Sequence, residues 1–116
     1  MGVRLADRLE TLRDDLVMHF VHEEEALFPY LSAAVPTLAP AISDLLALHD
    51  EICATVARLV HLAESPARIA GLVPVFDRFQ VAYTKHTHGE LVLFEQAATH
   101  LTRDQRLELT ALVKGL

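Results

Sequence analysis

Apolar residues recur at steps of three or four along the first thirty residues, a spacing that places them on one face of a helix. Two polar residues occupy positions in this series, which reads Leu5, Leu9, Leu12, Leu16, His19, Glu23, Leu27 and Tyr30. The pattern predicts a first helix from about Val3 to Tyr30, with Pro29 near its end. A carboxylate and an imidazole are therefore expected to point at the core.

The same periodicity continues along the rest of the chain. A second helix is predicted from Ala41, with an apolar face of Ile42, Leu45, His49, Ile52, Val56, Leu59 and Ala63. A third is predicted from either Ala67 or Pro74, with a face of Leu72, Phe76, Phe79, Tyr83, His86, Glu90, Leu93 and Ala97. Thr102 and Gln105 form a capping box that predicts a last helix from Arg103 to about Lys114. The fold class is all-α, an antiparallel bundle of three long helices and a short C-terminal helix.

Length and composition limit the classes of protein that remain. With 116 residues, 52% of them hydrophobic, the chain is expected to form one domain over residues 1–116. Sixteen acidic against ten basic residues give a net charge of −6 without a basic stripe, so nucleic acid is not an expected partner. No apolar run approaches the ~18 residues of a membrane span. The single cysteine, Cys53, and a charged N-terminus favour the cytoplasm.

A histidine lies on the apolar face of each of the three long helices, and two of the three add a glutamate four residues later. They are His19 and Glu23, His49, and His86 and Glu90, with each His–Glu pair four residues apart. A buried carboxylate without a partner costs several kcal/mol, so a counter-charge is required. Either a buried ion pair or a metal ion supplies one. Counting residues from the helix ends, at ~1.5 Å rise each, allows the three histidines to meet near one level of the bundle.

Imidazole and carboxylate donors suit iron, manganese or zinc. On neighbouring helices such groups can hold a pair of ions, with the glutamates bridging them. We favour two iron ions, mostly because of the resemblance that follows.

Two motifs resemble those of the hemerythrin-like, HHE cation-binding family. One is His-Phe-x-x-Glu-Glu-x-x-Leu-Phe-Pro, here residues 19–29, and the other is His-x-His-Gly-Glu, here residues 86–90. The resemblance implies a four-helix bundle with a di-iron centre, whose ions an oxide or hydroxide can bridge, that binds, senses or detoxifies dioxygen, nitric oxide or peroxide. It also implies the site residues: His19, His49 and His86 as iron ligands, and Glu23 and Glu90 as bridging ligands.

The chain departs from the family pattern at its start, where the family's first helix and its histidine have no counterpart. Three explanations remain open. The first is that the terminal helix takes the place of the missing helix, with Glu108 or Asp104 as a stand-in ligand. The second is that two chains cover each other's exposed apolar faces. The third is that the true coding start lies upstream. Of these we expect a homodimer.

Other polar residues receive simpler interpretations. His22, His61, His88 and His100 are expected in solvent, and Glu24 and Glu25 on a charged face. Asp15 either orients His19 or is solvated, while Tyr83 and Cys53 are interpreted as core residues. Two rival functions stay open: a zinc or manganese site that activates water, and a metal-free or zinc-binding helical interaction module. The sequence leaves undecided whether the protein is an enzyme.

Overall fold

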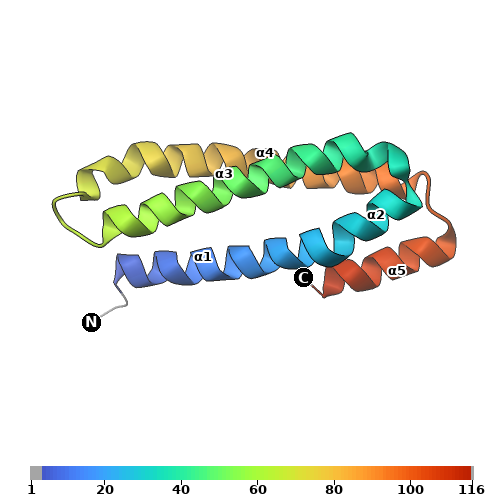
Figure 1. Cartoon of the computed structure of the whole chain (residues 1–116), viewed down its shortest axis with the longest axis horizontal. Coiled ribbons are helices and arrows are strands. Elements are labelled where there is room, and N and C mark those ends of the chain that lie inside the picture. The colour runs from blue at the N-terminus through green and yellow to red at the C-terminus, as the bar shows by residue number, and fades with distance from the viewer. Residues whose placement is uncertain (1–3, 116) are drawn as a thin grey trace.

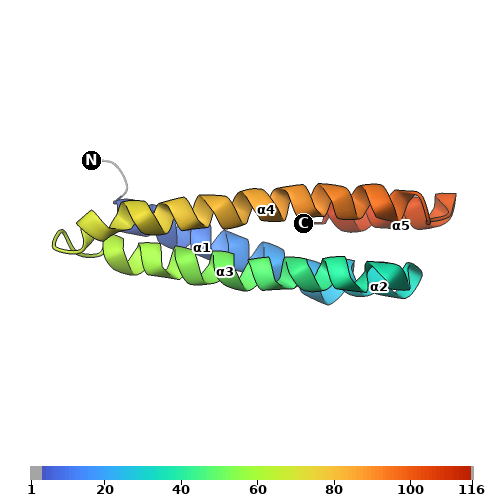
Figure 2. The same ribbon diagram turned by 90° about the horizontal axis from the view of Figure 1, so that it is seen from above.

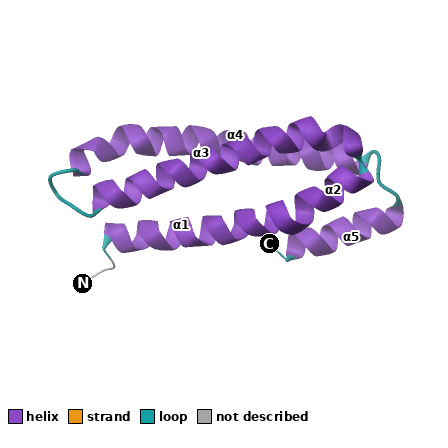
Figure 3. Ribbon diagram, in the orientation of Figure 1, coloured by secondary structure: helices purple, strands orange, loops and turns teal. Residues whose placement is uncertain are grey.

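The computed structural model describes residues 4–115, and its regular elements are all helical (Figures 1 and 3), which confirms the all-α prediction. In chain order they are α1 (Leu5–His22), a π-helical turn η1 (Glu23–Leu27), α2 (Phe28–Ala34), a 3-10 turn η2 (Pro36–Leu38), α3 (Ala39–Ala63), a second 3-10 turn η3 (Ile69–Gly71), α4 (Leu72–Ala98) and α5 (Arg103–Lys114). None of the helices described is long and apolar enough to cross a membrane.

The helices form an elongated antiparallel bundle with extents of 54 × 26 × 18 Å. α3 packs against both α1 and α4, and each pair runs in opposite directions (Figures 1 and 2). α2 follows α1 past the π turn and bends away from its line (Figure 1). At that end of the bundle α5 folds back and contacts η1.

The first helix differs most from its prediction. It does not end near Tyr30 but passes through Pro29 to Ala34, with a π-helical turn just before the proline; Val3, where it was expected to begin, lies outside the described residues. In that turn the amide of Phe28 donates to the carbonyl of Glu23, five residues back. The wider turn precedes Pro29, whose ring would otherwise clash with the carbonyl of the residue four positions before it.

The π turn also changes which residues face the core. Phe28 and Leu31 are fully buried, whereas Tyr30 is partly buried and packs against the edge of the apolar cluster that contains them. The hydroxyl of Tyr30 donates to the carboxylate of Glu108 on α5 at 2.8 Å. Glu108, considered above as a stand-in ligand, thus contacts α2. It does not belong to the group of histidines and glutamates described below that could hold a metal ion.

Other helix boundaries follow simple chemistry. α3 starts at Ala39, two residues before its predicted start, because Pro40 fits the first helical turn, where an amide would have no partner. α4 starts at Leu72, between the two predicted starts. The capping box of α5 is present: the side chain of Thr102 accepts from the amide of Gln105 at 3.2 Å, and the side chain of Gln105 accepts from the amide of Thr102 at 2.9 Å.

Two apolar clusters fill the bundle, one toward each end. The first contains Leu16, Phe20, Ile52, Val56, Leu59, Leu62, Val75, Phe79 and Ala82. The second contains Leu27, Phe28, Leu31, Val35, Leu38, Ile42, Leu45, Leu93, Ala97, Leu101 and Leu109. In each long helix, the histidines and glutamates that were predicted to meet lie between the residues of the two clusters. Four residues predicted to face the core are exposed instead, namely Leu5, Leu12, Phe76 and Tyr83.

Candidate metal centre

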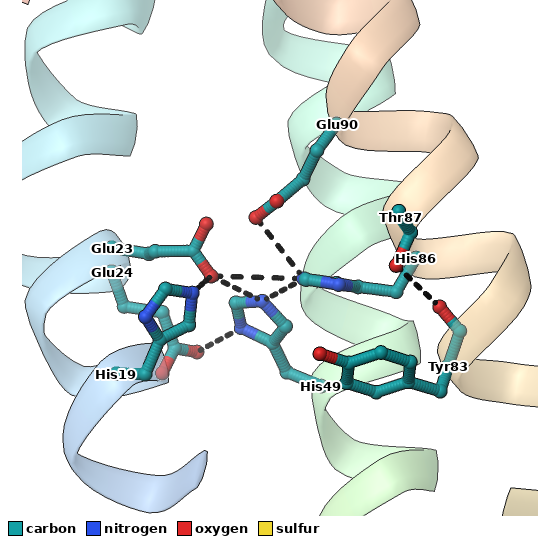
Figure 4. Close-up of polar contacts among 8 residues, drawn as sticks. All are labelled: His19, Glu23, Glu24, His49, Tyr83, His86, Thr87 and Glu90. Atoms are coloured by element: carbon teal, nitrogen blue, oxygen red, sulfur yellow. Dashed lines mark hydrogen bonds and ion pairs between the residues drawn. The ribbon is translucent and has the colours of Figure 1, made fainter. Parts of the chain in front are cut away.

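Three elements bring one polar side chain each to the middle of the bundle (Figure 4). The π turn supplies Glu23, α3 supplies His49 and α4 supplies His86. The Nε2 atoms of the two histidines lie 2.9 Å apart. The Oε1 atom of Glu23 lies 3.1 Å from Nε2 of His49 and 3.6 Å from Nε2 of His86.

Two further side chains border this group. Glu90, one turn after His86, places Oε1 3.2 Å from the Nε2 atom of that histidine. His19, one turn before Glu23, places Nε2 3.6 Å from Oε1 of that carboxylate. The His19 side chain is 37% exposed, so it marks the solvent side of the site. Of the five residues predicted to form the site, Glu23, His49, His86 and Glu90 lie together as a group able to hold a metal ion, and His19 borders that group through Glu23.

The centre is buried to a degree that is unusual for ionisable groups. Relative exposure is 0% for Glu23, 2% for His49 and 4% for His86. Both carboxylate oxygens of Glu23 and Oε1 of Glu90 are buried and have no hydrogen-bond partner within residues 4–115. Leaving such atoms unpaired costs free energy, so the arrangement requires positive charge among them.

The pKa values of these groups reflect that requirement. Burial alone would raise the pKa of Glu23, but the adjacent imidazoles of His49 and His86 outweigh it and hold that pKa well below its usual range. Burial would lower the pKa of His86, yet the carboxylates of Glu23 and Glu90 raise it to about 9. Burial raises the pKa of Glu90, and the nearby Glu23 adds to the increase. A proton on His86 thus provides the missing positive charge when no cation is bound.

A cation fits the same place. Glu23, His49, His86 and Glu90 each offer a ligand atom, and these atoms all lie within 4.8 Å of one another. Ligands on opposite sides of an ion, each bound at ~2.1 Å, are about 4.2 Å apart, so small movements suffice for coordination. Imidazole nitrogen and carboxylate oxygen are also the donors that divalent transition metals accept. The unpaired oxygens and the donor set therefore fit a metal ion.

Aromatic rings hold the central histidine in place. Phe20 stacks on His49 with ring centroids 3.8 Å apart and planes 10° apart. The ring of Phe28 lies at 5.6 Å from that of His49, tilted by 19°. Tyr83 lies beside His86 at 6.3 Å, but its side chain is exposed, so its interpretation as a core residue is wrong.

Sequence reasoning missed two features near the centre. Glu24, expected on a charged face, is indeed exposed, but its Oε1 lies 3.9 Å from Nδ1 of His49. His22, expected in solvent, is only partly exposed; its Nε2 is buried near Gly115 and lacks a hydrogen-bond partner among the residues described. Both follow from backbone details, the π turn and the return of α5, that the sequence pattern does not reveal.

The remaining polar residues agree with their simpler interpretations. His61, His88 and His100 are exposed. Asp15 is exposed too, which favours its solvated interpretation over a role in orienting His19. Cys53 is partly buried and packs against the apolar cluster that contains Phe20.

The family model for the hemerythrin HHE cation-binding domain matches residues 3–105, most of the chain. Searches of curated proteins and of solved structures returned no match.

Proposed function

Because the chain belongs to the hemerythrin HHE cation-binding domain family, we propose that it is a non-haem iron protein that binds two iron ions and reacts with dioxygen or nitric oxide. The family and the clustered donors together support binding of a cation. The residues that would hold the ions are His19, Glu23, His49, His86 and Glu90. The observation that carries the proposal is the fully buried carboxylate of Glu23, which lies among three imidazoles and has no hydrogen-bond partner among residues 4–115.

The position of Glu23 favours two ions over one. His19 approaches its carboxylate from the exposed side, and His86 with Glu90 approaches from α4. A carboxylate between two sets of donors can bridge a pair of ions, as inward-facing glutamates do in helical bundles.

Small uncharged ligands suit this centre. A pair of ions would have more coordination positions than these five side chains fill, which would leave room for water or a diatomic molecule. Ferrous ions held by these residues would supply electrons to dioxygen or nitric oxide. The apolar clusters at both ends and the rings of Phe20 and Phe28 restrict access to small molecules, while the exposed edge at His19 offers an entrance. Many open positions favour reactivity, hence sensing or detoxification, over reversible oxygen carriage. The cytoplasm remains the proposed location.

The proposal is tested by titrating metal-free protein with ferrous iron without oxygen. We expect two ions per chain. Subsequent addition of dioxygen or nitric oxide should change the near-ultraviolet absorption and the electron paramagnetic resonance spectrum. Binding of one ion per chain would replace the di-iron proposal with a mononuclear site. Iron that binds but responds to neither gas would overturn the proposed reactivity.

A pair of variants ties the result to the site. The double variant His86→Ala/Glu90→Ala removes two donors from α4 and should abolish tight iron binding. His88→Ala on the same helix changes an exposed histidine outside the cluster, so it should keep the iron stoichiometry of the unmodified protein.

A further inference from the structure

His49 presents its two ring nitrogens to different carboxylates. Its Nε2 faces the centre, at 3.1 Å from Oε1 of Glu23 and 2.9 Å from Nε2 of His86. Its Nδ1 points away from the centre, toward Oε1 of Glu24 at 3.9 Å (Figure 4). The consecutive residues Glu23 and Glu24 of the π turn thus lie near opposite nitrogens of one imidazole.

The imidazole ring of His49 cannot easily rotate by a half-turn. Phe20 stacks flat on it, and Phe28 lies nearly parallel to it. A half-turn of the imidazole would place a carbon against Glu23 in place of Nε2. Packing and chemistry therefore both hold Nε2 toward the centre and Nδ1 toward Glu24.

A proton must then reside on Nδ1 whenever Nε2 binds a metal ion, because a coordinating histidine is neutral and carries its proton on the other nitrogen. In the structure Nδ1 is buried and lacks a hydrogen-bond partner among residues 4–115. A buried N–H without an acceptor weakens the site. The Glu24 side chain is 40% exposed, so it has room to move the roughly 1 Å that separates its present position from ordinary hydrogen-bond distance.

We propose that Glu24 is a positioning residue for the metal centre, which accepts the Nδ1–H hydrogen bond of His49. The contact holds the tautomer in which Nε2 is free to coordinate, and the negative charge makes the imidazole a stronger ligand. The role of Glu24 depends on the metal binding proposed above, but Glu24 itself is not one of the proposed ligands.

The test compares metal affinity in the whole protein, with Zn(II) as a diamagnetic probe and Fe(II) under anaerobic conditions. Competition with a chelator should give a 10- to 100-fold weaker affinity for Glu24→Ala, about the range seen when such outer carboxylates are removed. Glu24→Gln keeps an acceptor without the charge and should fall between Glu24→Ala and the unmodified protein. Glu25→Ala is the matched control, because it removes a neighbouring exposed carboxylate and should leave affinity unchanged.

Nitrogen-15 NMR of the Zn(II) form supplies a second readout that a general loss of stability would not produce. The Nδ1–H signal of His49 should be present and exchange slowly with water in the unmodified protein and in Glu25→Ala. It should exchange faster in Glu24→Ala. Equal affinities for Glu24→Ala and Glu25→Ala, with unchanged exchange at Nδ1, would overturn the role of Glu24 alone. Failure of the unmodified protein to bind either metal would overturn the proposed function as well.

Discussion

At the residue scale, the centre is a set of charges that must balance inside an apolar bundle. Glu23 is fully buried, and its low pKa keeps it ionised at neutral pH. Without a cation the charge of Glu23 is offset by protonated His86, whose pKa the surrounding carboxylates raise to about 9. A metal ion would replace that proton, so cation binding and proton release are linked.

Stability of the metal-free protein should therefore depend on pH in a specific way. His86 has a higher pKa in the folded state than the ordinary 6.5, so its contribution is complete below pH 6.5 and is lost as pH rises through about 9. Glu23 has a lowered pKa, so its contribution is present above pH 4.5 and is lost as pH falls further. Urea unfolding in the presence of a chelator measures both contributions, with a pH series that extends well below 4.5 and above about 9.

The variant His86→Gln separates this effect from general alkaline denaturation. It lacks the titrating imidazole, so its stability should change much less between pH 6.5 and 9 than that of the unmodified protein. An equal alkaline decline in both proteins would show that His86 is not the group responsible.

At the element scale, the sequence predicted what depends on regular helices and missed what depends on local departures from them. Steps of three and four residues correctly located the long helices and placed His49 and His86 in the interior. They assume a uniform turn, so they could not reveal the π turn, which buries Phe28 five residues after Glu23. Nor could they show that Glu24 lies near His49.

Periodicity also predicts which residues share one face of a helix. It does not predict how much of that face neighbouring helices bury. Leu5 and Phe76 fall on predicted core faces, yet both lie where no described helix covers them. Whether the five donors meet depends on how far each helix is shifted along the bundle axis. Counting residues showed only that such a meeting was possible. The donor types narrow the candidate metals to iron, manganese and zinc.

The short helix α5 should depend on its N-terminal cap. Thr102→Ala removes the side-chain oxygen that accepts from the amide of Gln105, which should cost about 1 kcal/mol. Urea unfolding and hydrogen exchange of the α5 amides measure the loss. Thr110→Ala is the control, because Thr110 is an exposed residue inside the same helix and alanine is the better helix former. Equal behaviour of the two variants would contradict a role for the cap.

At the scale of the whole molecule, the two apolar clusters enclose the polar centre while part of the apolar surface stays open. Exposed apolar side chains on the predicted core faces are Leu5 and Leu12 on α1 and Phe76 and Tyr83 on α4. Uncovered apolar surface of this kind favours association. We propose that a second copy of the chain covers these residues in a homodimer with two-fold symmetry.

Light scattering after gel filtration should give twice the mass of one chain. Phe76→Gln places a polar group on the proposed interface and should shift the protein toward the monomer. Leu107→Gln, an exposed position on α5 outside that surface, should leave the mass unchanged. A monomer at all accessible concentrations would contradict the dimer, and so would identical masses for the two variants.

The central claim is that the buried cluster around Glu23 holds metal. Elemental analysis of the protein purified without added metal or chelator tests it most directly, with His86→Ala/Glu90→Ala prepared in parallel. We predict about two iron ions per chain in the unmodified protein and little or none in the variant. Protein that contains no metal and takes up none when loaded with ferrous iron without oxygen would contradict the claim.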